Sequence, residues 1–118
     1  MKITDLKKEP SQRLSGPGVE YNGVSKQLPI GTADGAPNFS MRVFTLDPGG
    51  FSPHHKHPWE HEVYVLSGKG VAIDDDGAEY PIEEGSFIFV PPNDMHQFRN
   101  ASETEQFQFI CIVPKEHE

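Results

Sequence analysis

The sequence predicts a single all-β domain, a β-sandwich or barrel, and three observations support this. A chain of 118 residues has the size of one domain, large enough to bury a core and too small to divide into two. From residue 41 onward, short apolar segments are broken by turn-forming residues about every ten residues, the spacing expected of a sandwich or barrel. Signals for helices are nearly absent. We therefore look for one site, held by strands and the loops between them.

Each predicted strand ends at residues that favour a turn. Asp47-Pro48-Gly49-Gly50 closes the first strand, and Pro58 closes the second. Further along, Asp75-Asp76-Gly77 resembles a hairpin turn. The predicted strands cover residues 41–46, 51–57, 62–67, 71–74, 78–82, 86–90, 95–99 and 107–113.

The two ends of the chain differ from this core. We interpret residues 1–40, rich in glycine and proline around Gly16, Pro17 and Gly18, as an irregular arm of the same domain that contains one or two edge strands. Residues 24–30 are the better strand candidate, and Pro29 confines them to a sheet edge because proline has no N–H to donate. Residues 41–114 form the predicted barrel core, and residues 115–118 a loose tail.

Charge and hydropathy exclude several classes of protein. Ten Lys and Arg residues against 18 Asp and Glu residues give a net charge of −8, which argues against binding to nucleic acids or anionic membranes. The longest apolar runs, 87–90 and 109–113, fall far short of the roughly 18 residues of a spanning helix. The N-terminus has no apolar stretch typical of a secretory signal, and the single cysteine, Cys111, cannot form an intrachain disulfide. We expect a cytoplasmic protein that acts on a small molecule.

The strongest chemical signal is a histidine cluster. Four of the six histidines lie within eight residues: His54, His55, His57 and His61. In a strand, residues two apart share a face, so His55 and His57 point the same way and His54 the other. After the turn at Pro58, His61 is in phase with the apolar face of the next strand. Three imidazoles can thus meet on an inward face, where a metal cation is the partner that neutral imidazole favours.

Other interpretations of these histidines exist. A lone histidine in a proline-rich stretch is more often a surface residue than a ligand, and we assign His54 and the tail residue His117 to that class. The string from His57 to His61 also matches the inverted zinc-protease pattern H-x-x-E-H. That pattern requires a helix, which Pro58 disfavours, so we reject it.

Two motifs in the middle of the chain resemble those of the cupin superfamily. The first is G-(x)5-H-x-H-(x)3-H-(x)6-G over residues 49–68, with His61 where most cupins have glutamate. The second is G-(x)5-P-x-N-(x)2-H-(x)3-N over residues 85–100. Its Asn93 stands where the family usually has glycine, and asparagine tolerates the left-handed turn conformation nearly as well. The resemblance implies a single-domain cupin, that is, a double-stranded β-helix or jelly-roll barrel.

The chain is also similar to a narrower group, the small manganese-containing single-domain cupins of thermophilic bacteria. This similarity extends over about residues 24–115, and it rests on the substitution at position 61 and on segments 38–42, 57–62 and 91–96. It implies a metal ion bound by four histidines: His55, His57, His61 and His96. Glu62 is the rival third ligand, but strand alternation places it on the opposite face from His61.

The resemblance implies manganese, one ion per chain. Ligand chemistry alone does not, because manganese prefers harder oxygen ligands and an all-histidine set favours iron, nickel, copper or zinc. We therefore expect manganese first and iron second, with zinc, nickel or copper as alternatives in the isolated protein.

The same site suggests what the protein does. Four imidazoles leave two positions of an octahedral ion open and its +2 charge uncompensated, which favours an anionic substrate. Phe109 and Cys111 share an apolar face of the last strand and are expected to line the substrate pocket, although Cys111 is equally explained as a small core residue.

Three functions follow from these expectations. The first is an oxygen- or peroxide-dependent, dioxygenase-like metalloenzyme for a small apolar or aromatic substrate. The second is a non-catalytic module that binds a metal or small ligand, and the third is a metal-dependent sugar isomerase. We also expect a homodimer in which the arm or an edge strand contacts the partner, since two-fold dimers commonly cover such edges.

Overall fold

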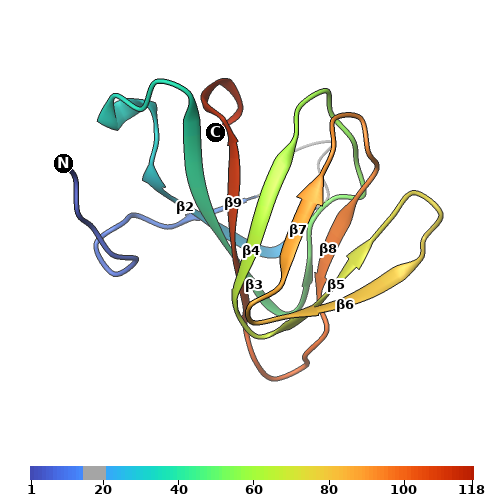
Figure 1. The fold of residues 1–118 in the computed structure, drawn as a ribbon. Coiled ribbons are helices and arrows are strands. Elements are labelled where there is room, and N and C mark those ends of the chain that lie inside the picture. Colours follow the sequence, from blue (N-terminus) through green and yellow to red (C-terminus); the bar gives the residue numbers. More distant parts are fainter. Residues whose placement is uncertain (15–20) are drawn as a thin grey trace.

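The protein is a curled antiparallel β-sheet in a computed structural model that describes residues 1–14 and 21–118 (Figure 1). Within these residues the only helical segments are two 3-10 turns, η1 (Thr32–Asp34) and η2 (Lys115–His117). The predicted all-β class is therefore confirmed. The strands are β1 (Gln12–Arg13), β2 (Asn22–Ile30), β3 (Phe39–Phe51), β4 (His61–Ser67), β5 (Lys69–Ile73), β6 (Glu79–Glu83), β7 (Phe87–Val90), β8 (Gln97–Asn100) and β9 (Phe107–Pro114).

Strand order places β3 and β9 at the centre of the sheet. The order is β6-β5-β8-β3-β9-β4-β7, and β2 lies between β1 and β3. Arg42 of β3 is opposite Cys111 of β9, which in turn is opposite Val63 of β4. Figure 1 shows the sheet curling so that β5, β6 and β8 form a wall apart from β2 and β9. The described residues contain no helix that is both long and apolar enough to cross a membrane.

The core forms because the strands alternate as the sequence predicts. Along β9, Phe107, Phe109, Cys111 and Val113 are buried, and the residues between them are only partly buried. Opposite them, Phe44 and Leu46 of β3 and Val63 and Val65 of β4 are buried. Burial of these side chains on one face of each strand closes the interior of the barrel.

The segment after residue 46 differs from the prediction. β3 does not stop at Asp47-Pro48-Gly49-Gly50 but continues to Phe51, and the register against β2 shifts there. The turn residues therefore form a bulge within one long strand, and Gly49 adopts a φ of 71°. The Asn100 side chain fastens the bulge by donating hydrogen bonds to the carbonyls of Leu46 and Asp47.

The predicted strand over residues 51–57 is mostly absent. Phe51 ends β3 and is opposite Arg99 of β8, and beyond it His55 forms an isolated bridge with His96 through two backbone hydrogen bonds of 3.1 and 2.9 Å. Proline at positions 53 and 58 explains the interruption, because it donates no hydrogen bond to a ladder. The histidine segment is therefore a loop held by a few backbone hydrogen bonds rather than a strand.

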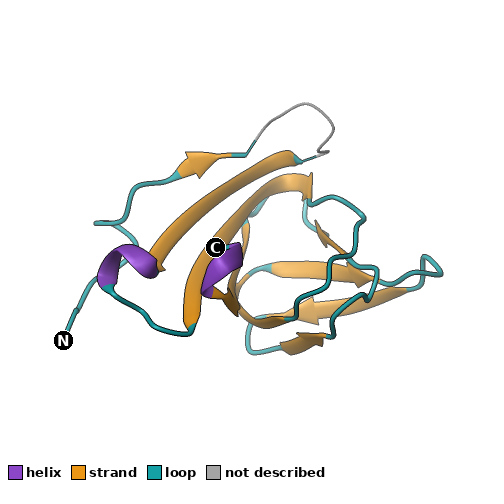
Figure 2. Cartoon of the chain, turned by 90° about the horizontal axis from the view of Figure 1, so that it is seen from above, coloured by secondary structure: helices purple, strands orange, loops and turns teal. Residues whose placement is uncertain are grey.

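Both ends of the chain are tied to the sheet. β1 pairs with Ser25 and Lys26, so β2 is not an edge strand at those two residues, and Figure 2 shows β1 lying beside β2. The glycines and proline at positions 16–18 lie outside the described residues. The predicted loose tail is instead a short 3-10 turn, and the Glu118 side chain accepts hydrogen bonds from Thr32 and Ser40.

Candidate metal centre

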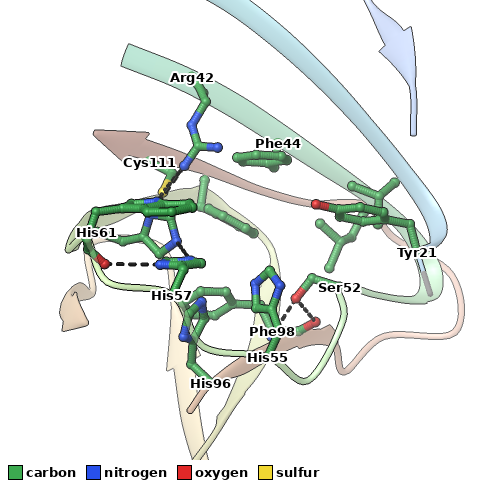
Figure 3. A pocket seen from close by; sticks show the side chains of 14 residues that line it. Tyr21, Arg42, Phe44, Ser52, His55, His57, His61, His96, Phe98 and Cys111 are labelled. Atoms are coloured by element: carbon green, nitrogen blue, oxygen red, sulfur yellow. Dashed lines mark hydrogen bonds between the residues drawn. The ribbon is translucent and has the colours of Figure 1, made fainter. Parts of the chain in front are cut away.

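Four histidines from three parts of the fold converge in one pocket (Figure 3). His55 and His57 come from the loop before β4, His61 is the first residue of β4, and His96 directly precedes β8. The ring centroid of His57 lies 5.1 Å from the ring centroids of His55 and His96 and 4.4 Å from that of His61. The four residues predicted as metal ligands are thus brought together.

Backbone carbonyls orient two of these rings. Nδ1 of His57 lies 3.0 Å from the Trp59 carbonyl oxygen, and Nδ1 of His96 lies 2.8 Å from the Asp94 carbonyl oxygen. A carbonyl only accepts, so each Nδ1 carries the proton and each Nε2 keeps its lone pair. One ring nitrogen of each of His55, His57 and His96 lies within 4.8 Å of the others. These three histidines could hold a metal ion.

A turn between the two motifs supports this arrangement. Asn93 has a φ of 65°, which confirms the left-handed conformation expected at this position. Its backbone N–H donates a 2.7 Å hydrogen bond to the His57 carbonyl. This bond ties the loop that carries His57 to the loop that carries His96.

His61 lies beside the other three. It is 6% exposed, and its Nε2 is 2.7 Å from Nε2 of His57. Two imidazole nitrogens bound at right angles to one ion at about 2.1 Å lie about 3 Å apart, so a small rotation brings both to ligand distance. Nδ1 of His61 lies 3.2 Å from Nη2 of Arg42, which can only donate, so Nδ1 accepts and Nε2 of His61 donates to Nε2 of His57. Binding of a metal ion through Nε2 would require this proton to move to Nδ1, where Cys111 Sγ at 3.3 Å can accept the hydrogen bond. The rival ligand Glu62 is exposed on the other face of β4.

The histidines are neutral at neutral pH. Burial lowers the pKa of His55 to about 4 and the pKa of His61 to about 2, and the neighbouring positive groups add to both effects. Burial also lowers the pKa of His57 and of His96. Because a metal ion binds only neutral imidazole, these environments fit a metal site.

Arg42 is a site residue that we did not predict. It is 8% exposed, and its Nη2 lies 3.2 Å from His61 Nδ1 and 3.1 Å from Cys111 Sγ. Alternation along β3 was the available signal, because Arg42 shares the inward face with Phe44 and Leu46. A charged residue at an inward register position is uncommon and points to a function.

Trp59 and His117 form a second feature outside our prediction. The Trp59 ring stacks on His57 at 4.1 Å and on His117 at 3.6 Å, with interplanar angles of 4° and 6°. His117, assigned above to the tail, therefore covers the outside of the site. His54 remains outside the cluster, with its Nε2 3.0 Å from the Asp74 carbonyl oxygen.

Aromatic side chains form the rest of the pocket. The cavity measures about 140 Å³ and is lined by Phe44, Phe98 and Phe109 beside the histidines. The structure places both predicted pocket residues, Phe109 and Cys111, in this lining. Cys111 also belongs to the core cluster, and burial raises the pKa of its thiol. Such a cavity accommodates about one aromatic ring, since an engineered apolar cavity of about 150 Å³ binds benzene.

Curated relatives are similar over most of this chain. It is 29% identical to auxin-binding protein 4 of Zea mays, across 96% of the chain and 57% of the relative. It is 32% identical to 1-methylthio-D-xylulose 5-phosphate methylsulfurylase of Rhodospirillum rubrum, across 66% of the chain and 49% of the relative. The chain spans about half the length of these two relatives.

Solved structures share the fold. The polyketide cyclase RemF of Streptomyces resistomycificus superposes with a TM-score of 0.87 at 30% identity, covering 97% of this chain and 79% of that one. A predicted oxalate decarboxylase of Thermotoga maritima superposes with a TM-score of 0.81 at 23% identity, covering 97% and 99%. Residues 42–113, more than half of the chain, match the family model of the cupin domain. With its jelly-roll sheet and its histidine pocket, the chain belongs to the cupin family.

Proposed function

We propose that the chain binds one divalent transition metal ion through His55, His57, His61 and His96. The proposal is supported by the convergence of four neutral imidazoles in one pocket and by the carbonyl partners of His57 and His96. Manganese is the first candidate, on the similarity to manganese-containing cupins, and iron the second, on ligand chemistry.

The single tryptophan offers a direct test of metal binding. Trp59 stacks on His57, so a paramagnetic ion bound to His57 should quench its fluorescence. Protein purified without nickel affinity resin is stripped of metal, titrated with Mn²⁺ and Fe²⁺, and analysed for metal content. We expect one ion per chain and a quenching curve that saturates at that ratio. Lack of saturable quenching together with less than a tenth of an ion per chain would refute the metal site.

We further propose that the pocket performs an oxygen- or peroxide-dependent oxidation of a small aromatic substrate. The observation that carries this proposal is the aromatic cavity of about 140 Å³ that opens directly onto the histidines. A divalent metal at this position supplies Lewis-acid and redox chemistry. Phe44 and Phe109, whose ring centroids lie 5.5 Å apart, would hold a substrate ring against the histidines and exclude water.

An oxygen electrode tests the activity. Manganese- and iron-loaded protein are screened against phenols, styrenes and single-ring diketones, with oxygen uptake and products measured together. We expect uptake for single-ring substrates, and none for two-ring substrates that exceed the cavity. Absence of uptake and of product with both metals would reject the oxidase function.

A binding function without turnover is the second candidate. It is favoured by the auxin-binding proteins that the chain resembles over 96% of its length. Saturable binding of a single-ring acid without oxygen uptake or product would select it. The sugar isomerase hypothesis has less support, because none of the described residues lining the pocket is a carboxylate that could act as a base.

We also propose a homodimer. The exposed fractions of Phe39, Phe87 and Phe89 are 67%, 81% and 59%, and β7, which carries two of them, is the last strand in the sheet order. Three such side chains expose about 400 Å² of apolar surface, a substantial part of the roughly 800 Å² that each partner buries in a stable dimer. Light scattering should report twice the mass of the chain, and Phe87→Ser with Phe89→Ser should shift it to the monomer. A monomer at micromolar concentration would refute the proposal.

A further inference from the structure

The guanidinium of Arg42 is a buried positive charge with no counter-charge among the described residues. Among the described residues that line the pocket, Arg42 is the one permanently charged side chain, and none is a carboxylate. No described carboxylate forms a salt bridge with it. Buried charges are normally paired, so the guanidinium of Arg42 is expected to bind a negatively charged partner from outside the chain.

The geometry leaves donors of Arg42 available. Only Nη2 hydrogen-bonds to described side chains, namely His61 and Cys111, and neither is an anion partner of the kind that guanidinium prefers. The buried Nε has no hydrogen-bond partner in the part of the chain that the structure describes. Figure 3 shows the other terminal nitrogen turned towards Phe44, whose ring centroid lies 4.9 Å from Cζ of Arg42. The free side of the guanidinium thus faces the aromatic part of the cavity.

The charge of Arg42 acts across the whole pocket. It contributes to the lowered pKa of His55, His57 and His61, and it also lowers the pKa of Tyr21, although burial of that phenol has the larger, opposite effect. A metal ion held by four neutral imidazoles would add two further positive charges. An anionic ligand is therefore the species that this pocket stabilises most.

We infer that Arg42 binds the carboxylate of a small aromatic acid whose ring lies in the cavity beside Phe44 and Phe109. The inference rests on the ring site of the proposed function, and it adds the anionic group that the ligand must carry. A carboxylate fits because it offers a charged acceptor to the terminal nitrogen of the guanidinium that faces the cavity, and such charge-assisted hydrogen bonds are strong. The cavity of about 140 Å³ restricts the remainder of the ligand to about one ring.

The first experiment uses the unmodified chain. Benzoate and its neutral counterpart benzamide are titrated into the metal-free and the manganese-loaded protein, with calorimetry and Trp59 fluorescence as readouts. We expect benzoate to bind at least about tenfold more tightly in both forms, as a charge-assisted hydrogen bond allows. A preference that disappears in the metal-free form would assign carboxylate binding to the metal and overturn the inference.

The second experiment changes the arginine. Arg42→Met should lose the preference for benzoate, and Arg42→Lys should retain part of it because lysine keeps the charge but not the planar arrangement of donors. Arg99→Met is the matched control, since it removes the same charge from the exposed partner of Glu79. If Arg42→Met folds and keeps the full preference, the inference is wrong. If it does not fold, the comparison of benzoate with benzamide decides.

The outcomes also separate this inference from the proposed function. Equal binding of benzoate and benzamide would leave the ring site intact and overturn the role of Arg42. If the protein prefers benzoate but takes up no added metal ion, the role of Arg42 in carboxylate binding is supported and the metal centre is rejected. Absence of binding by either compound in both forms would overturn the ring site and the inference together.

Discussion

The histidine cluster and Arg42, two neighbouring parts of the pocket, differ in how their polar groups are satisfied. In the histidine cluster, His57 and His96 each donate Nδ1–H to a backbone carbonyl and keep a lone pair on Nε2. Arg42, which contacts the cluster at His61, is as buried as His96, yet it carries a charge, and its Nε has no hydrogen-bond partner among the described residues. The imidazoles can bind a cation, whereas the guanidinium can bind an anion. A ligand that contacts both parts should therefore be negatively charged, and the predictions below test each part separately.

The largest effect is expected in the histidine cluster. His96→Ala removes a buried imidazole that pairs, through its backbone, with His55 and is oriented by Asp94. Metal affinity should fall more than about 100-fold, because loss of a ligand costs more than the roughly 10- to 100-fold loss seen when only a partner that orients a ligand is removed. His54→Ala should change nothing, because His54 points out of the cluster. Equal loss in both variants, measured by Trp59 quenching, would contradict the site.

A smaller effect is expected for the fourth ligand. His61→Ala should weaken metal binding by about 10- to 100-fold, since His55, His57 and His96, whose ring nitrogens already lie together, all remain. Glu62→Ala, one residue away on the exposed face, should leave metal affinity unchanged. Metal analysis after dialysis against a competing chelator measures both. If Glu62→Ala weakens metal binding and His61→Ala does not, Glu62 rather than His61 is the ligand that follows His55 and His57 in the first motif.

The lowered histidine pKa values predict how stability depends on pH in the metal-free protein. Below the unfolded-state pKa of about 6.5, histidines of the unfolded chain become protonated, whereas His55 and His61 of the folded chain stay neutral because their pKa values are lower. The free energy of unfolding should therefore fall between pH 6.5 and 5, by up to about 1.4 kcal/mol per pH unit for each such histidine.

Urea unfolding at several pH values checks this slope. His55→Gln should reduce it, and His54→Gln should not. Three carboxyl groups also have a lowered pKa: Asp34, Asp74 and Glu118. They change the free energy of unfolding mainly below about pH 4.5, so they do not affect the slope between pH 6.5 and 5. A flat profile from pH 6.5 to 5 would contradict the neutral, buried histidines.

The smallest effect is expected for the aromatic lining of the pocket. Phe109→Trp should leave metal content intact, because Phe109 contacts the ring site rather than serving as a ligand. It should weaken binding of single-ring ligands by narrowing the cavity and cost about 1–3 kcal/mol of stability through overpacking. Calorimetry with benzoate and urea unfolding measure the two effects. Unchanged ligand affinity would place the ligand elsewhere.

Local pattern predicted much of this molecule and failed where proline intervened. Alternation identified the buried face of β9 and separated His61 from Glu62, because both depend only on the two-residue period of a strand. The same reasoning expected a strand over residues 51–57, and the structure has a loop there that still directs His55 and His57 inward. Turn residues at 47–50 were expected to end a strand, and they form a bulge because β2 and Asn100 hold the chain on both sides.

The sequence alone was sufficient for the all-β class, the spacing of the two cupin motifs and the inward phase of His55, His57 and His61. These properties depend on residues near one another in the chain, whereas His96, 35 residues after His61, was assigned through the resemblance to cupins. The tertiary structure alone decided that Arg42 meets Cys111, 69 residues away, and that Trp59 stacks on His117. Strand pairing and sheet closure bring such residues together, and neither is encoded in the local period of a strand. Only the pairing of β3 with β9 therefore shows that a positive charge, that of Arg42, lies beside the candidate metal site.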